Sequence, residues 1–155
     1  MKITTAILLV SIAFASCNAG TTQNNDSTGL PIKGTWKLIS GTLIEKGDTN
    51  ITYYTKDLSF IKIINDSHFA FLKHDLTKGK DSATASFGAG GGSYTLAGNQ
   101  YTEHLEYCND RQWEGNGFTF TVTIQNDTLI QSGTEKVANA NVDRINIEKY
   151  IRLKK

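Results

Sequence analysis

Carboxylate, imidazole and phenol groups are concentrated between Tyr101 and Tyr107, in the order Tyr-Thr-Glu-His-Leu-Glu-Tyr. Side chains of a β-strand alternate between its two faces, so Tyr101, Glu103 and Tyr107 share one face. His104 and Glu106 share the other. Whichever face of this strand points inward, one carboxylate is therefore carried into the interior.

His104 and Glu106 are two of the three or four ligands that a zinc or iron site requires. The other histidines are His68 and His74, and nothing in the sequence places either of them nearby. We therefore expect no metal and no cofactor, and solvent-facing roles for most of the histidines.

Glu103 or Glu106 could instead act in acid–base catalysis, because desolvation in a pocket raises the pKa of a carboxyl group. The alternative is an ion pair that braces the fold, with Lys62, Arg144 or Arg152 as the partner. We expect the ion pair. The chain also carries no nucleophile or phosphate-binding motif, so we expect no enzymatic activity and no catalytic residues.

The last predicted strand, residues 144–153, separates a polar from an aliphatic face. The polar face carries Arg144, Asn146, Glu148, Tyr150 and Arg152. Apolar counting alone would bury the isoleucines of the other face. We expect the polar face to lie inward or at a closed end, because a cavity with water and ligand can satisfy polar groups.

Short β-type segments separated by turns fill most of the chain. They are residues 32–45, 49–54, 58–64, 68–73, 82–87, 101–107, 118–124, 129–132 and 144–153. Residues 118–124 alternate between apolar side chains and threonine, which predicts a half-buried strand. Only one helical turn is expected, between Glu135 and Val142.

Three turns share one layout, at Asn65-Asp66, Gly98-Asn99 and Asn126-Asp127. Glycine, asparagine and aspartate tolerate the positive φ of tight hairpins. The pattern predicts an all-β fold, an antiparallel up-and-down meander closed into a barrel of about 8–10 strands, since closure leaves no free edge. The glycine-rich stretch 88–92 is not followed by a helix and predicts a strand entry or bulge.

Composition excludes some classes of function. The chain has 155 residues, 39% of them hydrophobic and 10% aromatic, which fits one domain with a moderate core. Its formal net charge is +1 with no basic stripe. Nucleic acid is therefore not an expected partner, because phosphates require clustered lysine and arginine.

The N-terminus has the form of an export signal. Met1-Lys2 precedes a run of apolar and small residues that ends at Ala15. At 1.5 Å per residue this run reaches only about 20 Å, which is too short for a bilayer core. Phe14-Ala15-Ser16-Cys17 resembles the lipobox of bacterial lipoproteins, with phenylalanine where leucine is preferred. The alternative is an ordinary secretory signal.

The lipobox resemblance implies cleavage after residue 16 and lipidation of Cys17. We divide the chain into a signal peptide (1–16), a lipidated cysteine with a flexible tether (17–31) and a folded domain (32–155). Removal of residues 1–16 leaves 15 basic and 15 acidic residues. Membrane attachment would therefore depend on the lipid. Cys108 would then be unpaired, and we expect it to behave as a small buried residue.

Five segments taken in order resemble a family of small bacterial lipocalin-like lipoproteins. They are Gly34–Trp36, Lys62–Phe69, Gly91–Tyr94, Tyr101–Tyr107 and Glu148–Arg152. The resemblance covers roughly residues 32–153 and implies a calycin-type barrel. It also implies that Gly34, Trp36 and Arg152 close one end, with the arginine packed on the indole ring.

The function expected from these features is binding of a small, partly apolar or amphipathic ligand by a monomeric envelope lipoprotein. The expected location is the outer membrane, facing the periplasm. The ligand-binding candidates are Lys62, His68, Tyr94, Tyr101, Glu103, Tyr107, Glu148, Tyr150 and Arg152. Two alternatives stay open, a filled structural module of the envelope and a barrel that binds a metal or haem.

Overall fold

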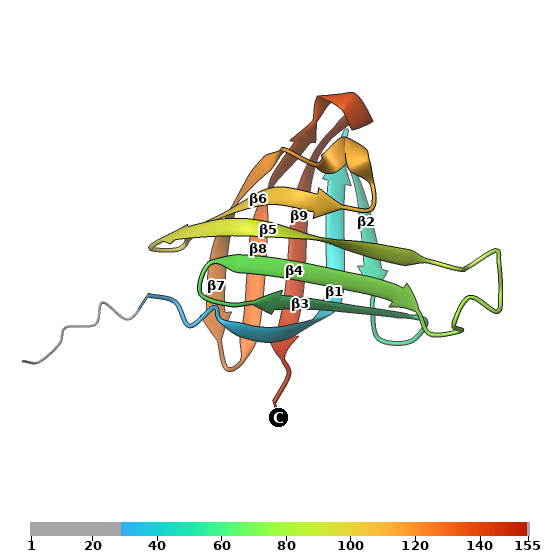
Figure 1. Ribbon diagram of the computed structural model, residues 1–155, viewed down its shortest axis with the longest axis horizontal. Coiled ribbons are helices and arrows are strands. Elements are labelled where there is room, and N and C mark those ends of the chain that lie inside the picture. Colours follow the sequence, from blue (N-terminus) through green and yellow to red (C-terminus); the bar gives the residue numbers. More distant parts are fainter. Residues whose placement is uncertain (1–28, 155) are drawn as a thin grey trace, which may run out of the picture.

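The computed structural model describes residues 29–154, which form nine strands and two single 3₁₀ turns (Figure 1). Cys17 and the expected signal peptide lie outside the described residues. The strands are β1 (Gly34–Glu45), β2 (Asp48–Tyr53), β3 (Leu58–Ile64), β4 (His68–Asp75), β5 (Phe87–Ala97), β6 (Gln100–Cys108), β7 (Gly117–Gln125), β8 (Thr128–Val137) and β9 (Val142–Arg152). The turns are η1 (Arg111–Trp113) and η2 (Ala138–Ala140), the second where one helical turn was expected.

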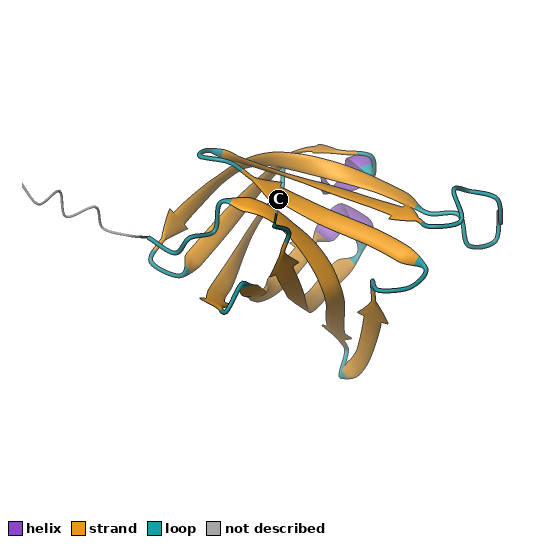
Figure 2. Ribbon diagram, turned by 90° about the horizontal axis from the view of Figure 1, so that it is seen from below, coloured by secondary structure: helices purple, strands orange, loops and turns teal. Residues whose placement is uncertain are grey.

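The strands form an antiparallel meander that closes on itself, which confirms the predicted fold class. The sheet order runs β2-β1-β3-β4-β5-β6-β7-β8-β9, and β1 also pairs with β9. β1 pairs with two strands along the same side: its first part, Gly34–Lys37, pairs with β3, and its second part, Ser40–Glu45, pairs with β2. Eight strands therefore close the barrel, and β2 extends it beside β1 (Figures 1 and 2).

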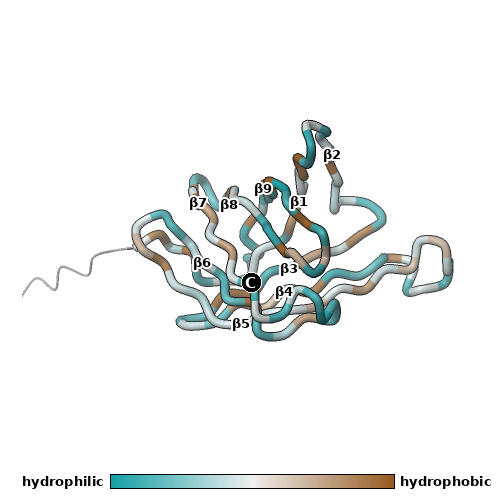
Figure 3. Tube along the Cα trace, turned by 90° about the horizontal axis from the view of Figure 1, so that it is seen from above, coloured by the Kyte–Doolittle hydropathy of each residue, from teal (hydrophilic) through white to brown (hydrophobic). Residues whose placement is uncertain are grey.

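Alternating burial follows the sequence pattern most clearly in β7. Phe118, Phe120 and Val122 are buried, while the threonines between them are exposed. Burying an aliphatic or aromatic side chain contributes about 1.5–3 kcal/mol, so this pattern determines which face of the strand points inward. Figure 3 shows hydrophilic and hydrophobic residues interspersed along the strands of the barrel.

Two of the three predicted turns contain residues with positive φ. Asn126 and Asp127, between β7 and β8, have φ of 48° and 58°. These are the left-handed values that a two-residue hairpin turn requires and that asparagine and aspartate accept most readily. Gly98, between β5 and β6, has φ of 62°. The Asn65-Asp66 turn contains no residue with positive φ, and there Asn65 Oδ1 accepts hydrogen bonds from Ser67 N and His68 N at 2.9 and 2.8 Å.

The predicted strand at residues 82–87 is wrong for all but its last residue. β5 starts at Phe87, and residues 76–86 form a connection organised by the side chain of Asp75. Asp75 accepts hydrogen bonds from Thr77 Oγ1 (2.6 Å), Gly79 N (2.9 Å) and Ser86 N (3.1 Å). The bonds from Gly79, Thr77 and Ser86 hold the pKa of this carboxyl well below its usual range. A carboxylate that binds backbone N–H groups competes with strand pairing, which explains the loop.

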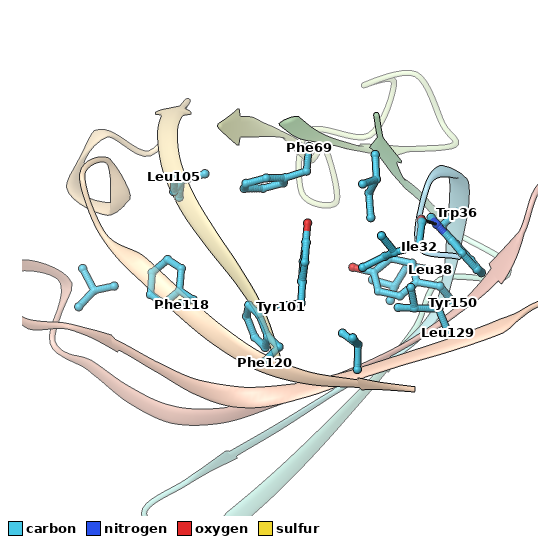
Figure 4. Close-up of a cluster of buried hydrophobic side chains, with 13 residues drawn as sticks. Ile32, Trp36, Leu38, Phe69, Tyr101, Leu105, Phe118, Phe120, Leu129 and Tyr150 are labelled. Atoms are coloured by element: carbon cyan, nitrogen blue, oxygen red, sulfur yellow. Dashed lines mark hydrogen bonds between the residues drawn. The ribbon is translucent and has the colours of Figure 1, made fainter. Parts of the chain in front are cut away.

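The hydrophobic core is concentrated at the end of the barrel where β1 begins and β9 ends. Trp36, Leu38, Leu129 and Tyr150 are at most 1% exposed and lie together in Figure 4. Leu30, from the expected tether, packs against this cluster. This end is closed by side chains, so any cavity must lie toward the other end.

Candidate functional site

The interior of the barrel contains a cavity of about 320 Å³. All nine strands and η1 contribute residues to its wall. The wall combines an aromatic part with a polar part that lies deeper, above the closed end. This combination is typical of sites for small molecules, which are mostly apolar with a few polar groups that orient the ligand.

The polar part is centred on Lys62 of β3, which is 3% exposed. Its ammonium group donates hydrogen bonds to Glu103 Oε1 at 2.7 Å and to Gln131 Oε1 at 3.1 Å. Glu148 Oε2 lies 3.8 Å away. β3, β6, β8 and β9 each place one member of this Lys62 cluster, because alternate residues of each strand face the interior. Of the ion pairs left open by the sequence, the structure contains the one between Lys62 and Glu103.

Burial and charge act against each other in the Lys62 cluster. Burial alone would lower the pKa of Lys62, but Glu103 and Glu148 attract its proton and raise the pKa above its ordinary value. Burial raises the pKa of Glu103, although Lys62 acts in the opposite direction. Lys62 is therefore charged, and it holds an otherwise unfavourable carboxylate in the interior.

Two tyrosines lie between the Lys62 cluster and the closed end of the barrel. Tyr150 Oη donates a hydrogen bond to Glu148 Oε2 at 2.7 Å. Tyr101 is fully buried, and its hydroxyl has no hydrogen-bond partner among the described residues. In Figure 4 this hydroxyl points into the space beside Phe69. Burial, followed by the nearby carboxylate of Glu103, raises the pKa of Tyr101 far above its usual range, so the phenol stays neutral.

A second ion pair lies nearer the mouth of the cavity. Arg144 of β9 bonds Glu135 of β8 through Nε and Nη2, both at 2.7 Å. Asn146 Nδ2 donates a hydrogen bond to the other oxygen of Glu135 at 2.7 Å. The guanidinium of Arg144 also lies over the ring of Trp113, 5.2 Å from its centroid. These contacts hold η1 against the barrel and place an indole ring in the cavity wall.

The aromatic part of the wall includes side chains from β3, β4, β7 and η1. The rings of Phe60 and Phe71 are stacked, with centroids 5.7 Å apart. Tyr54 meets Phe60 edge to face at 5.8 Å. Residues 54–57 connect β2 to β3 and form no strand, and Tyr54 in this connection lines the cavity.

The polar face of β9 points inward, as expected. Arg144, Asn146 and Glu148 line the cavity, and Tyr150 is buried. Of the predicted ligand-binding residues, Lys62, Glu103 and Glu148 reach the cavity wall.

Tyr94 lies apart from the cavity. Its ring packs against that of Tyr101 at a tilt of 53°, with centroids 5.2 Å apart, and its hydroxyl donates a hydrogen bond to Asn65 O.

The predicted placement of His68 and Tyr107 in the ligand site is wrong. His68 is exposed on the outside of β4, beside Ser67. Tyr107 is 68% exposed. A bulge causes this: Gly92 pairs with Leu105 and Gly91 with Tyr107, so β6 carries one extra residue and its alternation is reversed beyond Leu105. Cys108 reaches the cavity wall instead.

The predicted closure of the barrel is confirmed. Trp36 pairs with Arg152 across β1 and β9, and the guanidinium carbon lies 4.0 Å from the centroid of the indole ring. Arg152 also donates hydrogen bonds to Lys33 O and Pro31 O at 2.7 and 2.6 Å. Gly34 is required here, because it has φ of +138° and a Cβ atom would lie 2.7 Å from Arg152 Nη1.

Sequence reasoning missed several residues of the cavity wall: Phe60, Phe71, Trp113, Gln131 and Glu135. Gln131 and Glu135 share one face of β8 with the buried Leu129 and Val137. That alternation is present in the sequence and could have assigned them to the interior. Trp113 carries no comparable pattern, because it lies in a turn.

The histidines and the remaining cysteine take no part in the cavity chemistry. His68, His74 and His104 are all exposed on outward-facing positions. Within residues 29–154 no group of three or more histidine, cysteine, aspartate or glutamate side chains is arranged to hold a metal ion. Cys108 is a free, half-buried thiol, and burial raises its pKa, which makes it less reactive.

Comparisons of the chain with known protein families and with curated proteins find no match. Among the described residues no helix has the length and apolar character that crossing a membrane demands. The closed antiparallel barrel itself is consistent with a calycin-like domain.

Proposed function

We propose that this protein is an envelope lipoprotein whose lipocalin-like barrel binds a small, partly apolar ligand and performs no catalysis. It acts as a monomer, attached to the outer membrane and facing the periplasm. The observation that carries the proposal is the cavity of about 320 Å³, with aromatic walls and the Lys62 cluster at its base.

Cavity volume favours ligand binding over a filled structural module. Sites for small molecules start at about 300 Å³, whereas a filled barrel leaves few voids larger than one water. A purely structural core would also place apolar side chains where Lys62, Glu103 and Glu148 lie, since buried ion pairs add little stability. The third alternative, a histidine-ligated haem or metal, has no support, because the histidines point outward.

Native mass spectrometry of the protein purified from its own host tests the ligand proposal. We expect a bound small molecule on the wild-type protein and its loss from Gly41→Leu. Gly41 lines the cavity, and a Cβ atom there meets Tyr54 Cε2 at an unstrained 3.6 Å. A leucine side chain would therefore extend into the ligand space.

The matched control is Thr42→Leu, which adds a similar side chain at the next residue, on the opposite face of β1. It should keep the bound molecule. If neither wild-type protein nor control carries any small molecule under native conditions, ligand binding is rejected in favour of the filled module.

The lipid anchor gives a separate prediction. Cys17→Ser should move the protein from the membrane fraction to the soluble fraction, because the mature chain has equal numbers of acidic and basic residues and no charge-based affinity for membranes. Cell fractionation with a high-salt wash measures this, and Cys108→Ser is the control that should leave the protein in the membrane. A Cys17→Ser protein that still sediments with washed membranes would contradict the lipoprotein proposal.

A further inference from the structure

The fixed charges around the cavity do not balance. Inside the barrel, three carboxylates (Glu103, Glu135 and Glu148) face two cations (Lys62 and Arg144). Each cation has one close partner: Lys62 Nζ lies 2.7 Å from Glu103, and Arg144 lies 2.7 Å from Glu135. Glu148 is left without a close cation of its own.

Glu148 also has the most exposed side chain of the three carboxylates, which all line the cavity. Its distance to Lys62 is 3.8 Å, and the Tyr150 hydroxyl bonds the same oxygen, Oε2. No hydrogen bond from residues 29–154 reaches its other oxygen, and the side chain keeps 15% of its surface accessible, on the cavity wall. Lys73 and Asp110, which also line the cavity, carry opposite charges and do not alter the balance.

The surrounding rings favour a cation as well. The face of an aromatic ring attracts positive charge, and Arg144 already occupies such a position over Trp113 at 5.2 Å. Tyr54 lies within the field of Glu148: burial raises its pKa, and the charge of Glu148 raises it further. A positively charged group next to Glu148 would thus meet a carboxylate and an electron-rich wall.

Taking the cavity as a ligand site, as proposed above, we infer that its ligand is a small organic amine. Its ammonium group binds the free oxygen of Glu148, and its apolar part lies against Phe60, Phe71 and Trp113. The size limit follows from the volume, which equals that of about ten water molecules at about 30 Å³ each. An amine with one aromatic ring and a short chain fits this limit.

Three probes of similar shape and different charge test the inference on the full-length protein in detergent: phenethylamine, 2-phenylethanol and phenylacetate. Isothermal titration calorimetry measures each dissociation constant. We expect the amine to bind at least about tenfold more tightly than the alcohol, because it adds a charge-assisted hydrogen bond, and phenylacetate to bind most weakly.

Glu148→Gln should reduce the preference for the amine over the alcohol to about twofold or less, with binding of the alcohol retained. Glu106→Gln, the same change on the outer face of β6, should leave the preference intact. The comparison of probes on wild-type protein remains decisive if Glu148→Gln fails to fold.

The outcomes separate this inference from the proposed function. Equal binding of all three probes, tighter binding of phenylacetate, or an amine preference that survives in folded Glu148→Gln overturns the amine assignment and leaves ligand binding standing. Failure of every probe to bind, with a native ligand still present by mass spectrometry, also overturns it. Failure of the probes with no native ligand rejects both.

Discussion

Lys62→Met should destabilise the barrel by about 3–5 kcal/mol, the usual cost of leaving a buried charge without its partner. Methionine fills a similar volume but donates no hydrogen bond, so the carboxylate of Glu103 loses its 2.7 Å contact. Glu148 loses its nearest cation as well. The loss is a large part of the total stability of a small domain, about 5–15 kcal/mol. Urea denaturation followed by circular dichroism measures it.

The loss should depend on pH in a defined direction. Burial already raises the pKa of Glu103, and removing Lys62 takes away the attraction that opposes this rise. A carboxyl group whose pKa is higher in the folded than in the unfolded state supports folding at pH below its unfolded value of about 4.3. This support is lost as pH rises through the folded pKa. The difference between wild type and Lys62→Met should therefore be largest near neutral pH and shrink in mild acid.

Two variants complete this experiment. Lys149→Met, an exposed position on β9, should change stability by less than about 0.5 kcal/mol. The double variant Lys62→Met with Glu103→Gln should recover part of the loss, because the uncompensated charge is gone. A loss that is small and independent of pH would mean that water in the cavity solvates the carboxylates, and that Lys62 does not hold them.

Local patterns predicted most of the strands and, for β7 and β9, the face that points inward. The alternation of β7 and the polar row of β9 suffice, because side chains alternate at every residue of a regular strand. Tyr107 shows the limit of this reasoning. One extra residue in β6, opposite Gly91 and Gly92, reverses the alternation, and the absence of side chains at these glycines permits the close approach of the backbones there. A Cβ at Gly92 would lie too close to His104 O, and this contact exists only in the folded barrel.

The Lys62 cluster was predictable only in part. The charge types suggested an ion pair, but Lys62 and Glu103 are 41 residues apart, and three arginine or lysine partners were equally open in the sequence. The register of four strands selects among them. The cavity volume could not be predicted at all, because it is the space left after large side chains such as Phe60, Phe71 and Trp113 have packed.

Arg152→Ala should destabilise the protein by about 1–3 kcal/mol, the range expected for losing a packed and hydrogen-bonded side chain. The guanidinium covers the indole of Trp36 at 4.0 Å, a contact worth about 0.5–2 kcal/mol. It also bonds Pro31 O and Lys33 O, so its removal exposes the ring and frees the segment before β1. Tryptophan fluorescence of the variant should shift to longer wavelength, with quenching by acrylamide increased.

Two further variants, Arg152→Lys and Arg144→Ala, test whether the stability comes from the guanidinium geometry of Arg152 or from its charge, and which tryptophan is exposed. Lysine keeps the charge but not the planar fork that stacks on the ring while bonding two carbonyls, so Arg152→Lys should recover only a minor part of the stability. Arg144→Ala should expose Trp113 and leave Trp36 protected. In a Trp113→Phe background the fluorescence comes from Trp36 alone, and Arg144→Ala should leave it unchanged. Full stability of Arg152→Lys would show that charge alone closes the barrel, since nothing except the stacked, bidentate geometry differs between the two side chains at this position.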